Sequence, residues 1–546
     1  MSSYEEPPWY TGVQAVLAQR ARYRKGWEEA GFWSAQTLYD RIGAGIAQWP
    51  AARLIYCSEA RPSETTLRQA LTDSEIIARS FVAQGLCAGD VIVVQVPHWR
   101  EGMLTWLAAL QLGLVVVPIV HIYGAAELGF VLRQTRAKAL VTPASWRKID
   151  YAARFEVVGE TPDLSFIAVI GTEPFPGPAI SWDELFRRGE SLVPAPTHRA
   201  SPDDVCTIIY TSGTTSVPKG ALHTHNTLGA ELKSVHHWWE DYSPRAALAA
   251  MPAGHIAGIL IMMRPFILGG DSIHIDQWDP SVAVELIHRY GIRTSTGTPF
   301  HANSLFDAAA TRGVAPLSDM MIGGASVPPS TVTRADAVGV CIARAYGSTE
   351  HPTISTGKPY DRADQRANTD GRIMDLIQLR FLDDDNNEVA PGMAGEIISM
   401  GPDLCVGYFD ASLNDAAFMA DGGFRTGDIG VLDEAGMLTI VDRKKDIIIR
   451  GGENISSREV EDILARHPAV LEAAVLGWPD QVMGEKVGAF LRLAPGVTID
   501  LAEVRRHFQA AGVAKQKTPE QIRIVEDFPR TPSGKVKKVD LRKHLT

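Results

Sequence analysis

Residues 210–220 read Tyr-Thr-Ser-Gly-Thr-Thr-Ser-Val-Pro-Lys-Gly, directly after the apolar run Val205–Ile209. A buried strand that ends in a loop of glycines and hydroxyl side chains is typical of a phosphate-binding turn. Glycine lets the backbone approach an anion, and amides and hydroxyls donate to its oxygens. Lys219 adds a positive point charge. A Ser/Thr/Gly-rich hairpin turn would produce a similar string, and the stretch is not the G-x-x-x-x-G-K-[ST] pattern of P-loop enzymes.

The residues around this loop alternate between two kinds of apolar pattern. Strand-like runs are Val91–Val96, Val115–Pro118, Ala139–Thr142, Phe166–Ile170 and Val205–Tyr210. Helical patterns include Leu67–Gln84, Glu101–Leu112 and Val282–Tyr290. Such alternation predicts a mixed α/β fold, in which helices flank parallel sheets.

The pattern of apolar runs and turns changes toward the C-terminus. From about residue 370, short strands and Asp/Asn/Gly turns predict a smaller β subdomain. The charged stretch Asp442–Asp446 is either a solvated turn or a hinge, and Ser456–Glu459 matches the start of a capped helix. We therefore expect a large N-terminal body over residues 1–441 and a small mobile α+β domain over 442–546.

Composition excludes several classes of protein. The chain has 546 residues and a net charge of -11, which argues against nucleic-acid binding because a phosphate backbone requires a basic face. Five cysteines without a C-x-x-C pair predict reduced thiols and no zinc site, which favours the cytoplasm. The uncharged segment 102–120 is nearly long enough to span a membrane, but Pro118 and its β-branched second half indicate a helix followed by a buried strand. Peripheral membrane contact stays open.

The full string at 210–220 closely resembles the phosphate loop of the adenylate-forming (ANL) superfamily, which includes acyl-CoA synthetases. Six further segments resemble that family's signatures, in the family's order. They are Gly323–Ala325, Tyr346–Glu350, Gly395–Tyr408 with its Gly-Glu and Gly-Tyr pairs, Thr426–Asp428, Asp442–Asn454 and Pro532–Lys535.

The resemblance implies a role for each segment. It implies that Thr211 and Glu350 hold Mg²⁺ and that Lys535 is the catalytic lysine, so that all three act in catalysis. The residues implied to bind ATP or AMP are Thr211, Ser212, Gly213, Thr214, Thr215, Lys219, Gly324, Ala325, Tyr346, Gly347, Ser348, Thr349, Asp428, Arg443 and Lys535. Hard oxygen ligands suit Mg²⁺, and positive charge must screen the two anions that meet during adenylation.

The remaining implied sites concern the acid and the thiol. His255, Gly323 and Gly347 are expected to border the acyl pocket, although His255 would also suit a packed core position. Lys445 matches the hinge, and Gly451, Gly452, Glu453 and Asn454 are expected near coenzyme A. His223, His225, His236 and His237 lack a third ligand at metal spacing and are interpreted as structural or pocket-lining.

These implications predict an acid–CoA ligase that joins ATP, a carboxylic acid and coenzyme A through an acyl-adenylate. Met262, Met263 and Phe266 suggest a hydrophobic acid, which is medium-chain, alicyclic or aromatic. Three alternatives are a ligase that loads a carrier-protein pantetheine arm, a luciferase and a non-catalytic nucleotide-binding protein. A homodimer stays open.

Overall fold

The computed structural model describes residues 7–211, 218–238, 246–314, 316–531 and 534–545. The chain forms two compact units, and each is assembled from segments that are distant in the sequence. Unit 1 contains residues 1–296, 347–353 and 401–422, and unit 2 contains residues 297–346, 354–400 and 423–546.

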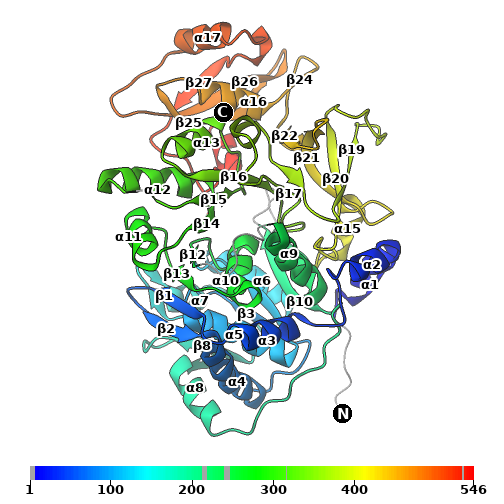
Figure 1. Cartoon of the computed structure of the whole chain (residues 1–546), viewed down its shortest axis with the longest axis vertical. Coiled ribbons are helices and arrows are strands. Elements are labelled where there is room, and N and C mark those ends of the chain that lie inside the picture. Colours follow the sequence, from blue (N-terminus) through cyan, green and yellow to red (C-terminus); the bar gives the residue numbers. More distant parts are fainter. Residues whose placement is uncertain (1–6, 212–217, 239–245, 315, 532–533, 546) are drawn as a thin grey trace. The chain divides into compact units, whose positions relative to one another are not determined.

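Unit 1 is built on a seven-stranded sheet of order β11-β10-β4-β3-β5-β8-β9. Figure 1 labels β3, β8 and β10 of this sheet. These strands are β3 (Val91–Val94), β4 (Val115–Pro118), β5 (Ala139–Pro143), β8 (Phe166–Ile170), β9 (Ala179–Ser181), β10 (Val205–Thr211) and β11 (Lys219–Thr224). Neighbouring strands are parallel except β10 and β11, which are antiparallel. The second group of strands in unit 1 is β1 (Arg53–Cys57), β2 (Ser63–Thr66), β12 (Ala247–Ala249), β13 (Ser272–Ile275) and β14 (Thr294–Gly297), and β6 (Ser145–Trp146) pairs with β7 (Ile149–Asp150).

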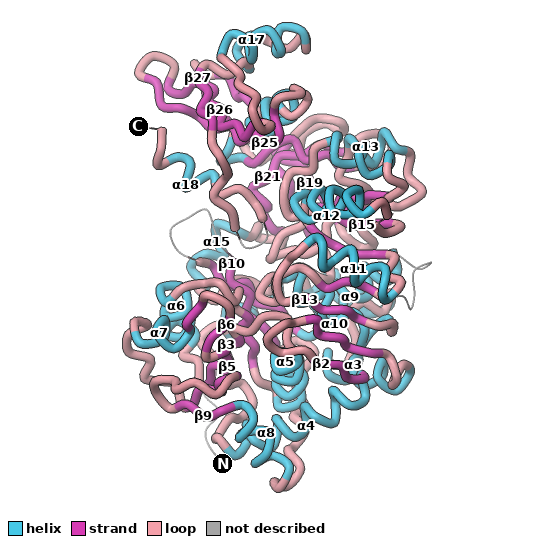
Figure 2. The backbone as a smooth tube through the Cα atoms, turned by 90° about the vertical axis from the view of Figure 1, so that its left-hand side faces the viewer, coloured by secondary structure: helices cyan, strands magenta, loops and turns pink. Residues whose placement is uncertain are grey.

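Helices cover both faces of the seven-stranded sheet, with α6 and α7 on one side and α5 on the other (Figure 2). The helices of unit 1 are α1 (Tyr10–Gln19), α2 (Ala21–Glu29), α3 (Leu38–Gln48), α4 (Leu67–Ala83), α5 (Arg100–Leu112), α6 (Ala125–Thr135), α7 (Tyr151–Glu156), α8 (Trp182–Glu190), α9 (His225–Trp238), α10 (Ile256–Leu268), α11 (Pro280–Tyr290) and α15 (Asn414–Ala417), with the 3-10 helix η2 (Ala411–Leu413). Side chains alternate across each strand. Ile92 and Val94 therefore pack in the core that contains α5, whereas Val91 and Val93 pack in the core that contains α6.

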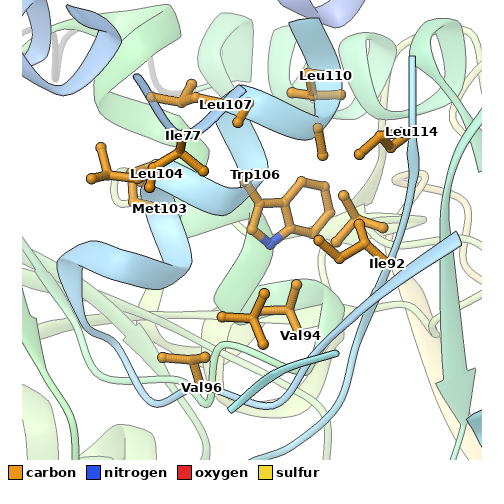
Figure 3. Packing of buried hydrophobic residues seen from close by; sticks show 14 of the residues in the cluster. Ile77, Ile92, Val94, Val96, Met103, Leu104, Trp106, Leu107, Leu110 and Leu114 are labelled. Atoms are coloured by element: carbon orange, nitrogen blue, oxygen red, sulfur yellow. The ribbon is translucent and has the colours of Figure 1, made fainter. Parts of the chain in front are cut away.

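Helix α5 is buried on nearly all sides, which explains why it carries no charged residue after Glu101. Trp106 at its centre packs among Ile77, Val94 and Leu110 (Figure 3). Gly113 ends the helix in the left-handed conformation, with φ of 70°, and β4 follows. The predicted helix-then-strand arrangement is confirmed, and within the described ranges no helix is long and apolar enough to cross a membrane.

Unit 2 contains three groups of strands with short helices. The first is β18-β17-β16-β15, from β15 (Asp319–Ile322), β16 (Cys341–Tyr346), β17 (Ser355–Thr356) and β18 (Arg372–Ile373), beside α12 (Pro299–Arg312), α13 (Pro329–Ala337) and α14 (Ala363–Asn368). The second is the antiparallel sheet of β19 (Gln378–Leu382), β20 (Gly395–Met400), β21 (Phe424–Leu432) and β22 (Leu438–Arg443). The third holds β23 (Ile448–Arg450), β24 (Glu453–Ile455), β25 (Val470–Asp480), β26 (Gly484–Leu493) and β27 (Gln521–Ile524), with α16 (Ser457–Leu464), α17 (Leu501–Ala510), α18 (Lys538–Arg542) and the 3-10 helices η3 (Lys444–Asp446) and η4 (Lys515–Lys517).

The predicted mixed α/β class, with a β subdomain and a small C-terminal α+β region, is confirmed. Ser456 caps α16 as expected, because its side chain accepts a hydrogen bond from the backbone amide of Glu459. The charged stretch Asp442–Asp446 begins at the end of β22 and continues as the 3-10 helix η3. The domain boundary at residue 442 stays a prediction.

Candidate active site

The stretch expected to bind phosphate is flanked by two paired strands. Thr211 ends β10 and faces Lys219, the first residue of β11. The hydroxyl of Thr211 donates to the carbonyl oxygen of Lys219 at 3.4 Å. Ser212, Gly213, Thr214 and Thr215 lie outside the described residues.

A segment from unit 1 that is far along the chain lies beside β11. The amide of Val406 donates to the Leu222 carbonyl at 2.8 Å, and the amide of Phe409 donates to the Gly220 carbonyl at 2.8 Å. This pairing places the ring of Tyr408 5.4 Å from the ammonium nitrogen of Lys219. At that distance a cation is attracted to the face of an aromatic ring.

Tyr408 also holds the carboxylate of Glu350. Its hydroxyl donates to Oε1 of Glu350 at 2.6 Å, and the amide of Cys405 donates to the Glu350 carbonyl at 2.8 Å. Burial, followed by the charge of Glu350, raises the pKa of Tyr408 far above its ordinary value. The phenol therefore stays protonated and remains a donor.

The loop before Glu350 is tightly constrained. A side chain at Gly347 would place Cβ 1.9 Å from the Pro352 carbonyl oxygen, so only glycine fits there. The amide of Ser348 donates to the His351 carbonyl at 2.8 Å. The carbonyl of Thr349 accepts a 2.8 Å hydrogen bond from Nε2 of His223.

The histidines His223 and His225 are both buried and hydrogen-bonded. His223 is fully buried and bonded to Thr349 and Thr227, and Nδ1 of His225 accepts from the Leu38 amide at 3.3 Å. These hydrogen bonds favour the structural one of the two expected roles, structural or pocket-lining. The side chains of His236 and His237 lie outside the description.

His255 precedes α10 and has an unusual environment. Burial lowers the pKa of His255 to about 4, so the imidazole is neutral at physiological pH. Its Nε2 is buried, and no described residue forms a hydrogen bond with it. Buried polar atoms are normally bonded, so this atom is suited to meet a substrate or a water.

Met262, Met263 and Phe266 lie on α10, the helix that begins directly after His255. All three side chains pack in the large core of unit 1 with Trp106 and its neighbours. They are explained by core packing, and they supply no evidence about the acid.

The second cluster of candidate residues lies in unit 2, around Asp428 on β21. The hydroxyl of Tyr346 donates to Oδ2 of Asp428 at 2.8 Å, and Nε of Arg443 lies 3.0 Å from Oδ1. The pKa of Tyr346 is raised by burial and then by Asp428. Each carboxylate oxygen has more than one acceptor position, so Asp428 can still accept a hydrogen bond from a ribose hydroxyl.

Gly323, Gly324 and Ala325 follow β15 in the same unit. A side chain at Gly323 would place Cβ 2.5 Å from the Ala345 carbonyl oxygen, and Gly324 has a φ of +71°. The backbone here can therefore approach a flat ligand closely.

Lys535 reaches this cluster from a turn near the C-terminus. The amide of Thr531 donates to the Lys535 carbonyl at 2.7 Å, and the amide of Lys535 donates to the Thr531 hydroxyl at 3.1 Å. Burial, then the charge of Arg443, lowers the pKa of Lys535 to about 7, although Asp428 opposes the shift. A lysine with such a pKa beside a carboxylate is typical of a functional site.

The proposed hinge and thiol residues follow Asp428 along the chain. Lys445 lies in η3, and burial followed by Arg443 lowers its pKa. Gly451 and Gly452 form the turn between β23 and β24, and together with Glu453 and Asn454 they are exposed. A Gly-Gly turn suits a tight hairpin because both residues have positive φ.

The oxygen ligands of Glu350 and Thr211 suit Mg²⁺ better than a metal ion that is bound by protein side chains alone. Among the described residues, no group of three or more His, Cys, Asp or Glu side chains is arranged to hold a metal. Mg²⁺ is commonly held by one or two carboxylates, waters and substrate phosphates, so Glu350 with the Thr211 hydroxyl is a sufficient protein contribution.

Tyr408 is the residue that sequence analysis missed. The Gly407-Tyr408 pair was part of a recognised segment, but a tyrosine after a glycine carries no chemical signal by itself. Only its pairing with β11 shows that it joins Lys219 to Glu350.

Known proteins resemble this chain over nearly its whole length. The profile described as AMP-binding enzyme matches residues 44–409, and that of the AMP-binding enzyme C-terminal domain matches residues 459–535. The chain is 33% identical to the medium-chain fatty-acid–CoA ligase of Escherichia coli strain K12, over 98% of this chain and 95% of that protein. It is 30% identical to the sulfoacetate–CoA ligase of Cupriavidus necator, over 93% of this chain and 98% of that protein. Among solved structures, ATP-bound MatB from Rhodopseudomonas palustris superposes with a TM-score of 0.81 at 26% identity, covering 93% of this chain and 98% of that one.

Proposed function

This chain belongs to the AMP-binding enzyme family and is an ATP-dependent, AMP-forming acid–CoA ligase, and we propose that it acts on a hydrophobic acid with the residues described above. The resemblance noted in the sequence is thereby confirmed at the level of the family. The specific acid, the residue roles and the domain movement belong to the proposal.

The reaction has two balanced steps. In the first, a carboxylate oxygen of the acid attacks the α-phosphorus of ATP, and pyrophosphate leaves. In the second, the thiolate of coenzyme A attacks the acyl carbon, and AMP leaves with the electron pair of the broken bond.

The site assignment is supported mainly by the proximity of Lys535, Arg443 and Asp428 in unit 2. Adenylation forces a carboxylate against a triphosphate, so positive charge must be fixed where those anions meet. Lys535 and Arg443 supply it, and Asp428 accepts from the ribose. Tyr346, Gly324 and Ala325 border the adenine.

The residues proposed to bind phosphate and metal belong to unit 1. Thr211 and Glu350 would hold Mg²⁺, which neutralises phosphate charge when bound. Lys219 and the residues 211–215 bind phosphate oxygens, and residues 347–349 line the same nucleotide. Tyr408 keeps the Glu350 carboxylate in place.

The acyl pocket is proposed to lie at His255, Gly323 and Gly347. A neutral imidazole at the start of an apolar helix favours an uncharged acyl group. The two relatives above are named for different acids, a fatty acid and sulfoacetate, so relatedness alone does not choose the substrate.

The C-terminal region, from residue 442 onward, is proposed to turn about Lys445 between the two steps. It would present Lys535 for adenylation and Gly451–Asn454 for thioester formation. We place the enzyme in the cytoplasm, where its thiols stay reduced, and a homodimer remains compatible with the proposal.

A carboxylate panel tests this function. Medium-chain, alicyclic and aromatic acids, with sulfoacetate as the charged comparison, are assayed by pyrophosphate release and then by thioester formation with coenzyme A or a pantetheinylated carrier protein. We expect the apolar acids and free coenzyme A to be preferred. Preference for sulfoacetate would overturn the acid class, and preference for the carrier would overturn the acceptor.

A further inference from the structure

A cluster of buried ionisable groups lies behind the loop that carries Glu350, and the reaction described above does not use it. Glu231 on α9 and His351 are 0% exposed, and Asp403 and Arg20 are 1% exposed. All of these residues belong to unit 1. With a neutral imidazole at His351, two buried carboxylates beside one guanidinium would leave an uncompensated negative charge, which is costly in a protein interior unless one carboxyl group carries a proton.

The hydrogen bonds show which carboxyl oxygens of this cluster already have a donor. Oε1 of Glu231 accepts from the Thr353 hydroxyl at 2.5 Å, and Oδ1 of Asp403 lies 3.1 Å from Nε2 of His351. The two remaining oxygens, Oε2 of Glu231 and Oδ2 of Asp403, are buried, and no described N–H or O–H group of another residue donates to them. Asp403 acts on Glu231 both through its charge and through a side-chain hydrogen bond.

We propose that Glu231 and Asp403 share one proton, so that neutral Glu231 donates from Oε2 to Oδ2 of the Asp403 carboxylate, and that this pair positions Glu350. Burial, followed by the charge of Asp403, raises the pKa of Glu231 well above its usual range. Arg20 balances the remaining charge, because it acts on Asp403 and its pKa, lowered by burial, is still about 10. Nη1 of Arg20 donates to the Leu404 carbonyl at 2.9 Å, which holds the guanidinium beside this segment.

The pair holds the loop on the C-terminal side of Glu350. Asp403 bonds to His351, the next residue, and Glu231 bonds to Thr353. Asp403 is also in the segment that leads to Cys405, whose amide donates to the Glu350 carbonyl, and to Tyr408, whose hydroxyl donates to its carboxylate. Repulsion between two ionised carboxylates would therefore separate the loop from the segment that fixes it.

This inference rests on the proposed role of Glu350, and paired variants test it. In Glu231→Gln, the amide nitrogen replaces the O–H donor and the amide oxygen still accepts from Thr353, so we expect the Mg²⁺ dependence of pyrophosphate release to stay close to that of the unaltered enzyme. In Glu231→Leu, Asp403 loses its donor. Indirect partners of metal ligands commonly contribute roughly ten- to hundredfold to metal affinity or activity, so we expect a weakening of that order.

The protonated carboxyl group can be detected by infrared spectroscopy, independently of catalysis. The infrared carbonyl stretch of a protonated carboxyl should be present at neutral pH and should be lost in Glu231→Gln. Glu184→Gln is the matched control, because Glu184 on the exposed side of α8 is an ionised partner of Arg187 and Arg188, and the band should remain there.

Three outcomes would overturn parts of the inference. An unchanged infrared band in Glu231→Gln would exclude the shared proton, and so would a Gln variant as impaired as the Leu variant. A Leu variant that folds and keeps its Mg²⁺ dependence would exclude the positioning role. If the Leu variant does not fold, as judged by thermal unfolding, the Gln variant and its infrared band still decide. An enzyme without pyrophosphate release would refute the proposed function and leave the infrared test intact.

Discussion

The hydroxyl of Tyr408 donates a 2.6 Å hydrogen bond to the carboxylate of Glu350, while its ring faces the ammonium group of Lys219. One side chain thus joins the strand after the phosphate loop to a candidate magnesium ligand. The relationship depends on a segment almost two hundred residues further along the chain than Lys219.

Tyr408→Phe should weaken the response to Mg²⁺ without unfolding the protein. The ring and its contact with Lys219 remain, but Glu350 loses a hydrogen bond. Hydrogen bonds to charged groups contribute about 1.5–3 kcal/mol, so the apparent Mg²⁺ constant should rise roughly ten- to hundredfold. Pyrophosphate release across a Mg²⁺ titration measures it, and an unchanged titration would separate Tyr408 from the metal site.

Glu350→Gln keeps the shape of the side chain and removes its charge. Pyrophosphate release should fall by orders of magnitude, because a carboxylate is the hard ligand that Mg²⁺ requires. Circular dichroism and thermal unfolding should show an intact fold. Glu184→Gln on α8 is a suitable control for the loss of one surface carboxylate, and full activity of Glu350→Gln would remove this residue from the site.

Lys535→Ala should impair only the first half-reaction. The ammonium group is needed when two anions are forced together, and its loss should cost on the order of 10²–10³-fold in adenylation rate. Given synthetic acyl-AMP and coenzyme A, the variant should form thioester at nearly the normal rate. Equal loss in both half-reactions would contradict this assignment.

The same lysine predicts a pH dependence. Its pKa is lowered to about 7, so in the free enzyme the ammonium form is populated below that pH and lost above it. The adenylation kcat/KM for ATP, which reports on the free enzyme, should therefore fall as pH rises through about 7. Lys535→Arg stays protonated and should lose this descending limb. A limb that persists in the arginine variant must come from another group.

Lys445→Pro should show the opposite half-reaction pattern to Lys535→Ala. Proline restricts φ, so the backbone rotation proposed at this position would be hindered. Adenylation should be retained and thioester formation slowed. Lys444→Ala, at the neighbouring exposed lysine, is the control for the loss of positive charge in η3.

His255→Ala should change the ranking of acids and leave the KM for ATP nearly unchanged. The neutral imidazole has a buried Nε2 that no described residue satisfies, which suits contact with an acyl group. The acid panel measures the ranking. A loss of thermal stability with the same ranking would assign His255 to packing.

Much of the secondary structure was predictable because it depends on nearby residues. The strand Phe166–Ile170 is confirmed to the residue, and the helix expected at Leu67–Gln84 is observed as Leu67–Ala83. Both follow from the apolar pattern, and in the structure the side chain of Thr66 caps the helix. Segment 102–120 was also separable into a helix and a strand, because its β-branched second half, which ends at Pro118, favours a buried strand.

Contacts between distant residues could not be predicted in the same way. Met262, Met263 and Phe266 suggested a hydrophobic acid, and the structure shows that their side chains pack in the core of unit 1. Nothing in the local sequence indicates which apolar side chains of α10 face inward against α3 and which face a ligand.

The sequence by itself determined the α/β class, the family and the residue types available for phosphate, ribose and metal. These features lie in short strings, where spacing and side-chain chemistry are sufficient. Only the tertiary structure showed that Tyr408 holds Glu350, that Asp428 lies between Tyr346 and Arg443, and that the buried carboxyl groups of Glu231 and Asp403 interact. A pKa shift or a shared proton depends on which charges meet after folding and on how much water is excluded, and neither is written in any local stretch of the chain.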